Sequence, residues 1–315
     1  MVDYNTPMDV FTQFDEFLHE RWDAALAHEP VVWPFYTFAW HRLWQAHFGH
    51  KEQIVIMSDA ANQVIIPLCV AYGTAHFTGG EEIADYLDAI GNSAHKAAVW
   101  QEAVMALKKQ GVNTLLLRNI PESSPTISAL KSLTGVQVTQ EDTTPILTLP
   151  ASFEEYLSAL DRKDRHELKR KMKKFEAEHR ALSFTPRTGS AVDVAPLLRL
   201  MRLDQDKNAF LTESMNGFFE DLPSVFPKDI WQFVLTTQET VIATTLAFRT
   251  GGSLLLYNSG FDPQYPGAGW YIKARTIAWA IGQSIRSYNF LQGNERYKYD
   301  LGAKDASVYR ISLPM

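Results

Sequence analysis

The chain has 315 residues, of which 46% are hydrophobic, 12% aromatic and 21% charged. This composition predicts a folded globular protein of about two domains and excludes a disordered or collagen-like chain. The formal net charge is −6, which argues against a protein that coats DNA through a uniformly basic surface.

Cysteine and histidine usage argues against a metal site. The single cysteine, Cys69, excludes an internal disulfide and a cysteine-built zinc or iron–sulfur site. It lies in the apolar run 64–70, so we expect a buried, unreactive thiol. His47 and His50 are three residues apart, but Phe48-Gly49 between them is typical of a helix end, and no H-E-x-x-H motif occurs. We therefore expect no bound metal.

The start of the chain and its hydropathy bear on location. Residues 1–7 lack the basic and apolar regions of a secretory signal. No stretch approaches the roughly 18 uninterrupted apolar residues that a membrane-spanning helix needs. We expect a cytoplasmic protein with no membrane partner.

Hydrophobic periodicity divides the first half of the chain into alternating helices and strands. Apolar spacings of three and four predict helices, and short β-branched runs predict strands. The expected helices are 8–30, 38–48 and 92–110, and the expected strands are 54–57, 64–72, 115–117 and 146–149, the last at a sheet edge. This alternation favours an α/β layer. Because 119–150 is rich in Pro, Ser and Thr, we place a domain boundary near 150, giving domains 1–150 and 151–315.

The segment 161–180 concentrates positive charge in an acidic protein. It holds nine Lys or Arg residues against five Asp or Glu residues, a local charge of +4. One interpretation is a solvated helix whose buried edge includes Leu168 and Phe175. The other is a basic surface for a phosphate-bearing ligand, either CoA or the acceptor end of a tRNA.

The second half predicts a β-rich region followed by a long helix. The expected helices are 192–201, 215–222 and 270–287, and the expected strands are 231–236, 241–248, 253–259 and 288–291. Gly251-Gly252 is typical of a two-residue hairpin turn between two of these strands. We expect a polar tail to close the chain.

The loop 264–269, between a predicted strand and a predicted helix, carries the clearest functional signal. Its sequence has the spacing Gln-x-x-Gly-x-Gly, and the helix begins directly after it. Glycines let backbone N–H groups approach a ligand, and a helix N-terminus adds unpaired N–H groups and a positive dipole end. We therefore expect this loop to bind a pyrophosphate.

Two other phosphate-binding motifs do not fit this loop. A Rossmann fingerprint requires a third glycine where Ile272 stands. A P-loop requires Lys-Ser or Lys-Thr where Trp270-Tyr271 stands. The preceding strand also belongs to a predicted antiparallel hairpin, which suits neither motif.

The loop resembles the acyl-CoA pyrophosphate loop of GNAT-fold N-acyltransferases, which reads Q/R-x-x-G-x-G/A between a hairpin strand and a helix. Its flanks, 260–265, Pro266-Gly267 and 288–298, are similar to the CelD/BcsL-type acetyltransferases, a family associated with cellulose biosynthesis. Asn289 stands where that family usually has an aspartate, and Tyr299-Asp300 replaces the expected basic and aromatic residues.

The resemblance implies an α/β (α+β) fold of two tandem GNAT-like domains, each with a mixed, mostly antiparallel sheet flanked by helices. It implies an enzyme that moves an acyl group from acetyl-CoA or another acyl-CoA to an amine bound between the domains. The acceptor is a small molecule, a peptide or a sugar amine. The expected CoA contacts are Asn258, Ser259, Gly260, Gln264, Gly267, Ala268 and Gly269.

Acyl transfer from a thioester also needs oxyanion stabilisation and the transfer of one proton. Glu295, Tyr297 and Lys298 follow a predicted strand end and a glycine, a common position for site residues, so we expect them to be catalytic. The alternative is that Tyr297 and Lys298 only cover the sheet edge. The cluster Asp85, Tyr86 and Asp88 either binds the acceptor or forms the start of a helix. If the cluster binds the acceptor, Asp85, Tyr86 and Asp88 are the substrate-binding residues.

Two other functions stay open. The CelD/BcsL type is related to Fem-type peptidyltransferases, which use aminoacyl-tRNA. The basic segment 161–180 favours tRNA, whereas the acidic composition and the lack of a long inserted helical hairpin argue against it. The third possibility is a non-catalytic binding protein with a degenerate GNAT domain.

Overall fold

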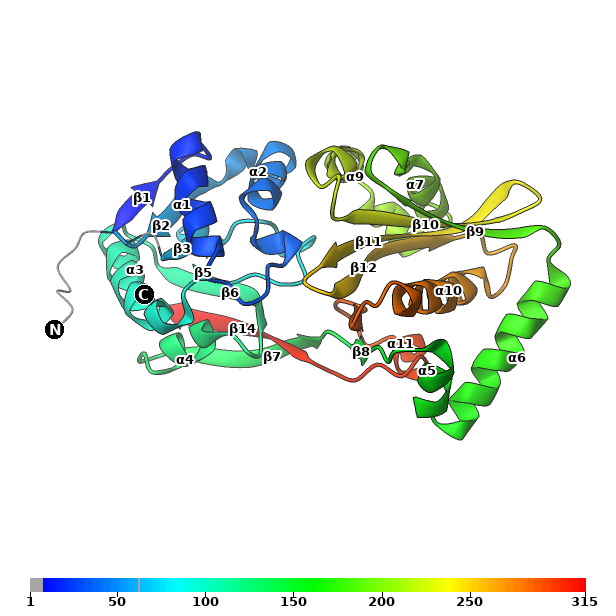
Figure 1. Ribbon diagram of the computed structural model, residues 1–315. Helices are drawn as coiled ribbons and strands as arrows, with labels where there is room; N and C mark the ends of the chain where they lie inside the picture. The colour runs from blue at the N-terminus through cyan, green and yellow to red at the C-terminus, as the bar shows by residue number, and fades with distance from the viewer. Residues whose placement is uncertain (1–7, 62) are drawn as a thin grey trace. The chain divides into compact units, whose positions relative to one another are not determined.

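The computed structural model describes residues 8–61 and 63–315. The chain divides into two compact units, the first ending at Thr143 and including Ala306–Met315, and the second spanning Thr144–Asp305 (Figure 1). Each unit has its own sheet with helices packed on it. The predicted α/β class with two sheets flanked by helices is therefore confirmed.

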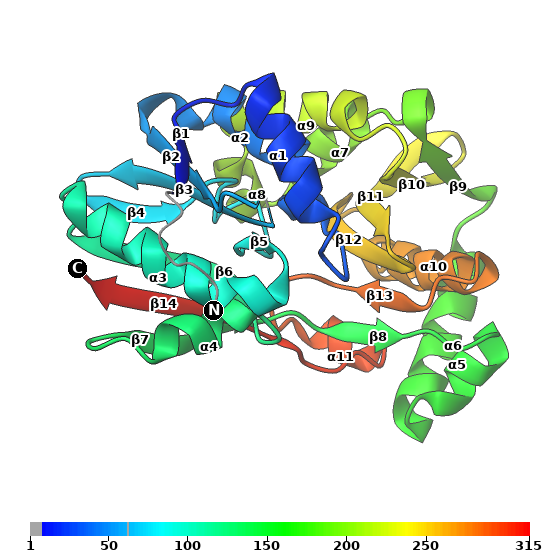
Figure 2. The ribbon, with the colours of Figure 1, turned by 60° about the vertical axis from the view of Figure 1, so that its left-hand side comes forward.

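The first unit contains an eight-stranded sheet in the order β1-β2-β3-β4-β6-β14-β7, with β5 paired to β3. Its strands are β1 (Asp9–Phe11), β2 (Gln53–Ser58), β3 (Val64–Ala71), β4 (Thr74–Phe77), β5 (Ile90–Gly91), β6 (Thr114–Pro121), β7 (Gln137–Thr143) and β14 (Ser307–Pro314). Its helices are α1 (Glu16–Leu26), α2 (Phe38–His47), α3 (Ser93–Lys109) and α4 (Pro125–Lys131), with short 3₁₀ turns at Pro34–Tyr36 and Gly49–Lys51. Figure 2 shows α1 and α3 on opposite sides of this sheet.

The helix expected over 8–30 is shorter than predicted. Its first residues form β1, and α1 begins only after Asp15, whose carboxylate accepts the Leu18 N–H at 2.9 Å. Periodicity did not distinguish the strand from the helix because both contain phenylalanine at short spacings, whereas the cap residue fixes the start.

The C-terminal residues differ most from expectation. The sequence suggested a polar tail in the second domain, but Ser307–Pro314 forms β14, which pairs with β6 on one side and β7 on the other. The side chains of Val308, Ile311 and Leu313 are buried. The domain boundary therefore lies close to Thr143, and the chain returns to the first unit at Ala306. Pairing partners so distant in sequence leave no local signal.

The second unit contains a six-stranded sheet in the order β8-β13-β12-β11-β10-β9. Its strands are β8 (Ile146–Thr148), β9 (Leu182–Thr188), β10 (Ile230–Thr237), β11 (Thr240–Thr250), β12 (Ser253–Phe261) and β13 (Ser287–Asn289). Its helices are α5 (Phe153–Ala159), α6 (Arg162–Glu178), α7 (Ala195–Met201), α8 (Gln205–Phe210), α9 (Glu213–Val225), α10 (Ala268–Gly282) and α11 (Arg296–Asp300), with a 3₁₀ turn at Gly189–Ala191.

Helices cover both faces of this sheet. Helix α7 packs on β11 and β12 from one side, and α10 packs on β10, β11 and β12 from the other (Figure 1). Ile272 and Ile277 of α10 are fully buried, as is Phe233 of β10. Helix α10 ends earlier than predicted because the Ile285 N–H donates back to Ala280 O at 3.0 Å, a bond that closes a helix C-terminus.

Cys69 is fully buried on β3, as predicted. No helix in the described part of the chain combines the length and hydropathy that a membrane span requires.

Candidate active site

The turn between β12 and α10 is built by local hydrogen bonds and one glycine. Asp262 accepts the Gln264 N–H on its carboxylate at 2.9 Å and the Tyr265 N–H on its carbonyl at 3.0 Å. Gly267 then has φ +95°, a left-handed conformation that strains any residue with a Cβ. Helix α10 begins at the next residue, so this glycine sets the direction in which the helix starts.

Backbone N–H groups are left without acceptors at this corner. Ala268 donates to Tyr265 O at 3.0 Å, and Tyr271 donates to Gly267 O at 2.8 Å. Within residues 8–61 and 63–315, no acceptor lies in reach of the N–H groups of Gly267, Gly269 and Trp270. Unpaired N–H groups at the positive end of a helix are the usual protein ligands of phosphate groups.

Gly269 is required for another reason than the one the motif suggested. A Cβ on this residue would lie 2.6 Å from Cδ1 of Phe261, so the Phe261 ring at the end of β12 packs directly on the helix backbone. At Gly267 a Cβ would meet Phe175 at an ordinary 3.6 Å, and only the positive φ demands glycine. Gly269 thus permits close packing, and Gly267 sets the direction of the chain.

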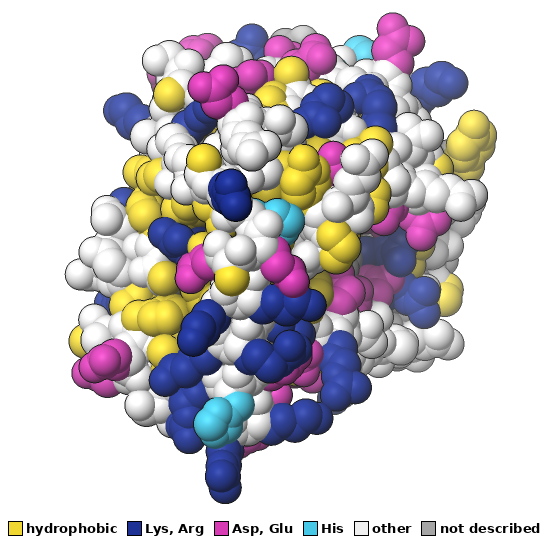
Figure 3. All heavy atoms as spheres, turned by 90° about the vertical axis from the view of Figure 1, so that its right-hand side faces the viewer, with side chains coloured by type: hydrophobic (Ala, Val, Ile, Leu, Met, Phe, Trp, Pro, Cys, Tyr) yellow, Lys and Arg dark blue, Asp and Glu magenta, His cyan; other side chains and the backbone are white. Residues whose placement is uncertain are grey.

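The corner opens on a hollow of about 470 Å³ between the start of α10 and helix α6. The hollow is lined by Arg170, Lys171, Lys174, Phe175, Glu178, His179, Pro266, Gly267, Trp270 and Tyr271. Helix α6 is the basic segment of the sequence, and Figure 3 shows Lys and Arg side chains gathered over this end of the molecule. The predicted pyrophosphate loop and the predicted basic surface are therefore two walls of one hollow.

The cations of α6 are held along its surface by acidic neighbours. Arg170 donates to both oxygens of Glu167, at 2.8 and 2.7 Å. The Lys171 ammonium lies 5.0 Å from the centre of the Trp270 ring, and that of Lys174 lies 3.6 Å from Glu178. These exposed pairs are weak in water, so an anion in the hollow would compete for the lysines at low cost.

Strand β12 is only partly paired on the side of β13. The parallel pairing joins Ser253–Leu255 to Ser287–Asn289 and ends there. At the same level the register with β11 shifts, leaving Tyr257 as an extra residue on β12. The last residues of β12, which include Asn258 and Ser259, therefore pair with β11 on one edge, and no strand among the described residues pairs with their other edge.

Gly260 lies on this segment, but it faces α7. A Cβ there would lie 2.8 Å from the Leu200 Cβ, so the glycine permits close packing of helix on strand. Its contact with CoA stays a prediction. Its close contact with α7 explains why this residue is a glycine.

Lys298 is buried, and its ammonium is surrounded by oxygen atoms. It donates to the carbonyls of Leu291, Gln292 and Gly293 at 3.2, 2.6 and 3.0 Å, and Glu295 Oε2 lies at 2.9 Å. Leu291 and Gly293 both have positive φ, so the ammonium holds a tightly turned loop. This arrangement fits a positioning role better than the predicted proton transfer.

Tyr297 and Glu295 lie beside this loop in different environments. Burial, and then the nearby Glu295 carboxylate, raise the pKa of the Tyr297 hydroxyl, so this group keeps its proton at neutral pH. The Glu295 side chain is 57% exposed. The two are suited to proton donation and proton acceptance respectively, the roles expected from the sequence.

Lys273 is the residue that sequence reasoning missed. It lies one helical turn after Gly269, on the face of α10 that contains Ile277, and is 6% exposed. Its ammonium donates to Gly269 O at 3.2 Å and lies 4.7 Å from the centre of the Tyr297 ring. A lysine at a buried helical position, spaced four residues from an apolar one, was the available signal.

Burial, aided by the cations Lys207 and Lys298 and opposed by Glu295, lowers the pKa of Lys273 to about 7. Lys207, on α8, donates to Ser259 O at 2.6 Å, and burial lowers its pKa too. A lysine that is partly neutral near pH 7 is able to accept a proton.

The three residues predicted to bind the acceptor lie in the first unit, and two of them are buried. Asp88 accepts from Ser124 Oγ and Thr126 Oγ1, each at 2.6 Å, and from the Ala89 N–H at 2.8 Å, with Lys96 Nζ at 3.5 Å. Its carboxylate therefore organises the core of its unit and has no free oxygen for a substrate. Tyr86 is also buried and packs against Trp33, and Asp85 is half-buried.

Comparison with known proteins supports the fold. Residues 162–299 match the family model described as an acetyltransferase (GNAT) domain, a span that includes α6, the glycine loop and Glu295–Lys298. A search of curated protein sequences gives no match. This match lies within the second unit.

Solved structures match over almost the whole chain at low sequence identity. FemX aligns with a TM-score of 0.67 and 11% identity, covering 98% of this chain and 97% of its own. The C-terminal domain of a putative lysylphosphatidylglycerol synthetase from Agrobacterium fabrum aligns with a TM-score of 0.64 and 12% identity, covering 93% and 91%. A tandem GNAT protein from the clavulanic acid biosynthesis pathway aligns with a TM-score of 0.53 and 12% identity, covering 97% of each chain. The chain therefore has the fold of tandem GNAT-like proteins.

Proposed function

We propose that this protein is an acyl-CoA-dependent N-acyltransferase whose donor site lies in the second unit. The observation that carries the proposal is the set of unpaired N–H groups at Gly267, Gly269 and Trp270, which open on a hollow walled by basic α6. N–H groups and lysines together suit the diphosphate of CoA.

The acyl arm of the donor would lie along the unpaired edge of β12. Amide groups of the arm add to a free strand edge by backbone hydrogen bonds, which directs the thioester toward Ser259. The same positions, Asn258 to Gly260, are the CoA contacts expected from the sequence. An amine acceptor then meets the thioester near Lys273 and Tyr297.

The chemical step removes two protons from a protonated amine and delivers one to the sulfur. Neutral Lys273 takes the first proton, and the amine nitrogen attacks the thioester carbon. The Glu295 carboxylate takes the second proton from this nitrogen as the carbon–sulfur bond breaks, and Tyr297 gives its proton to the thiolate. The proton on Glu295 then returns to Tyr297 through solvent, Lys273 releases its proton to solvent, and Lys298 keeps the loop in place. Acetyl is the proposed acyl group, and the CelD/BcsL type is the proposed family.

Binding of the donor can be measured without knowing the acceptor. A bound ligand raises the melting temperature by mass action, so acetyl-CoA, longer acyl-CoAs and free CoA are each added at millimolar concentration. We expect a shift with all three, since the diphosphate is common to them. The absence of any shift would remove the support for CoA binding.

A second function is favoured by the similarity to FemX and by the charge of α6, namely transfer from an aminoacyl-tRNA. Binding of total tRNA in place of CoA, with an affinity that falls steeply with salt, would support it. Under the acyl-CoA proposal tRNA at the same concentration leaves the melting temperature unchanged.

A further inference from the structure

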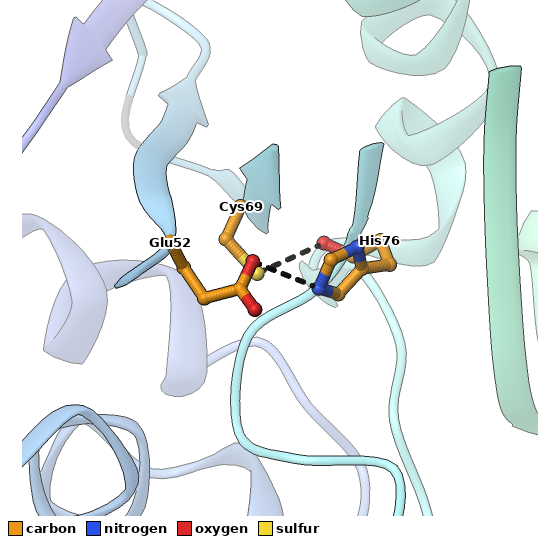
Figure 4. Close-up of side chains that lie close together, drawn as sticks. All are labelled: Glu52, Cys69 and His76. Carbon is orange, nitrogen blue, oxygen red and sulfur yellow. Dashed lines mark hydrogen bonds and ion pairs between the residues drawn. The ribbon is translucent and has the colours of Figure 1, made fainter. Parts of the chain in front are cut away.

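Three side chains of different chemistry converge on one face of the first unit's sheet. Cys69 of β3 and His76 of β4 are direct partners in the antiparallel register, so their side chains share a face. Cys69 also pairs with Ile54 of β2, and Glu52 lies two residues before Ile54, hence on that face too. Figure 4 shows Glu52, Cys69 and His76 pointing toward one another.

The donor atoms are close enough to share an ion. His76 Nε2 lies 3.3 Å from Glu52 Oε2, and the thiol, imidazole and carboxylate atoms all lie within 4.8 Å of one another. Around a tetrahedral Zn²⁺ with bonds of about 2.0–2.3 Å, neighbouring donors are roughly 3.3–3.8 Å apart. The longest donor–donor distance must therefore shorten by roughly 1 Å. Rotation of the Glu52 side chain can supply this change, because Glu52 precedes strand β2.

The cluster is not explained by its own contacts. Glu52 Oε2 is buried and accepts no hydrogen bond of good geometry from any residue that the structure describes, and the nearest ring nitrogen, His76 Nε2, lies 3.3 Å away. The Cys69 thiol reaches His76 O and Phe77 O at 3.7 and 3.8 Å, distances typical of weak contacts. A buried carboxylate oxygen without a donor is the group that a cation satisfies.

A cysteine nucleophile does not fit the same residues. Cys69 is fully buried, and burial together with the Glu52 carboxylate raises the pKa of its thiol. A reactive cysteine needs a lowered pKa and access to substrate. A metal ion has the opposite effect, since it displaces the thiol proton and stabilises the thiolate.

Access for an ion comes from a hollow of about 490 Å³ beside the cluster. Glu52 and Ile54 line it together with Arg42, Gln45 and His50. An ion can therefore reach the carboxylate from solvent while the cysteine stays inside the sheet.

We propose that Glu52, Cys69 and His76 form a binding site for a zinc-class divalent cation, with Sγ, a ring nitrogen and a carboxylate oxygen as ligands. Three protein ligands leave a fourth position toward the hollow, the arrangement of an open zinc site. Binding releases the thiol proton, so the affinity rises with pH. The site joins the ends of three neighbouring strands and is independent of the proposed acyl transfer.

The test uses the full-length, untagged protein, stripped with a chelator and titrated with Co²⁺ as the probe. Because Cys69 is the only cysteine in the chain, a thiolate-to-cobalt charge-transfer band reports on this site alone. We expect the band to saturate at one Co²⁺ per chain, with visible bands of a tetrahedral ion, and to disappear when Zn²⁺ is added. One proton per ion should be released at neutral pH.

Variants separate this site from other metal-binding surfaces. Cys69→Ser should abolish the charge-transfer band, and Glu52→Gln or His76→Gln should weaken Co²⁺ binding at least about tenfold. His50→Gln is the matched control, because His50 lines the same hollow without belonging to the cluster. Circular dichroism of each variant establishes that it is folded.

Two results would overturn the proposal. One is a folded wild-type protein that shows no charge-transfer band at millimolar Co²⁺. The other is a band that Glu52→Gln and His76→Gln leave unchanged in strength and midpoint. Since Glu52 and His76 are 24% and 27% exposed, their replacement by glutamine should not prevent folding.

Discussion

The ammonium group of Lys273 lies 4.7 Å from the centre of the Tyr297 ring. One residue comes from the helix after the glycine loop and the other from the short helix after β13, so the contact joins the two segments that the sequence marked as functional. Lys273 and Lys298 are both buried, but Lys298 contacts four oxygens and Lys273 donates to one carbonyl. This difference separates a lysine that is available for proton transfer from one that holds the fold.

The activity of the wild-type protein should rise with pH through about 7, because Lys273 has a pKa lowered to about 7 and is the base of the proposed mechanism when neutral. The charged groups that face it are Lys207, Glu295 and Lys298, with the Tyr297 ring beside it. Lys273→Met should lower kcat about 100-fold or more and remove this dependence. Lys273→Arg restores a buried cation and not a base, so recovery of activity in this variant would show a structural role.

Replacement of Lys273, which should lower the activity, should raise the stability of the fold. The folded pKa is near 7 and the unfolded value is 10.5, so the cost of burying this lysine is full below pH 7. That cost falls as pH rises from 7 toward 10.5, where the unfolded chain also loses the proton. Lys273→Met should therefore stabilise the fold by about 1–3 kcal/mol at pH 6 and by less at pH 9. Urea unfolding at the two pH values measures the difference.

Lys298→Met should destabilise the protein, since it leaves three carbonyls and Glu295 without their donor. The expected loss is about 2–4 kcal/mol. Lys304→Met, at an exposed lysine, is the control and should change stability by less than about 0.5 kcal/mol. A Lys298→Met protein of unchanged stability without activity would instead favour direct catalysis.

Gly267→Ala should cost about 1–2 kcal/mol of stability, because alanine is strained at φ +95°. It should also abolish the thermal shift with CoA, since relief of the strain turns the N–H groups of the corner. Gly111→Ala is matched for strain, with φ +81° and no atom within 4 Å of the added Cβ. That control should lose similar stability and keep its response to CoA.

Charge reversal on α6 should weaken CoA binding in a position-dependent way. Lys171→Glu and Lys174→Glu place an acid in the hollow and should each raise the Kd for CoA about tenfold at low salt, with a smaller effect at high salt. Lys169→Glu changes the same helix at an exposed residue outside the hollow's lining. Equal effects of all three variants, measured by calorimetry, would mean that only the net charge of α6 matters.

Much of the local structure followed from sequence. The helices at Phe38–His47 and Ser93–Lys109 agree with their predicted positions, because cap residues Thr37 and Asn92 mark their starts and apolar spacing marks their faces. The strand hairpin around Gly251-Gly252 also agrees, because both glycines adopt the positive φ that a tight hairpin turn requires. The predicted helices over 8–30 and 270–287 were too long where strand or turn residues continued the apolar pattern.

The partners of distant residues could not be predicted. Nothing local indicates that β14 returns to the first sheet, or that Asp88 is surrounded by donors from α4. A search for short motifs likewise cannot find the cluster of Cys69 on β3, His76 on β4 and Glu52 directly before β2. Strand register brings them together, and register is a property of the whole sheet.

The sequence by itself determined where the chain turns at Gly267 and which helix carries the positive charge. These features depend on backbone conformation and side-chain charge, which are local. The two sheets flanked by helices were implied by the family resemblance. Tertiary structure alone decided that α6 faces the glycine loop across a hollow and that Lys273 is buried beside Tyr297. Burial and electrostatic coupling arise only when distant segments pack together, and they set the pKa on which the proposed chemistry depends.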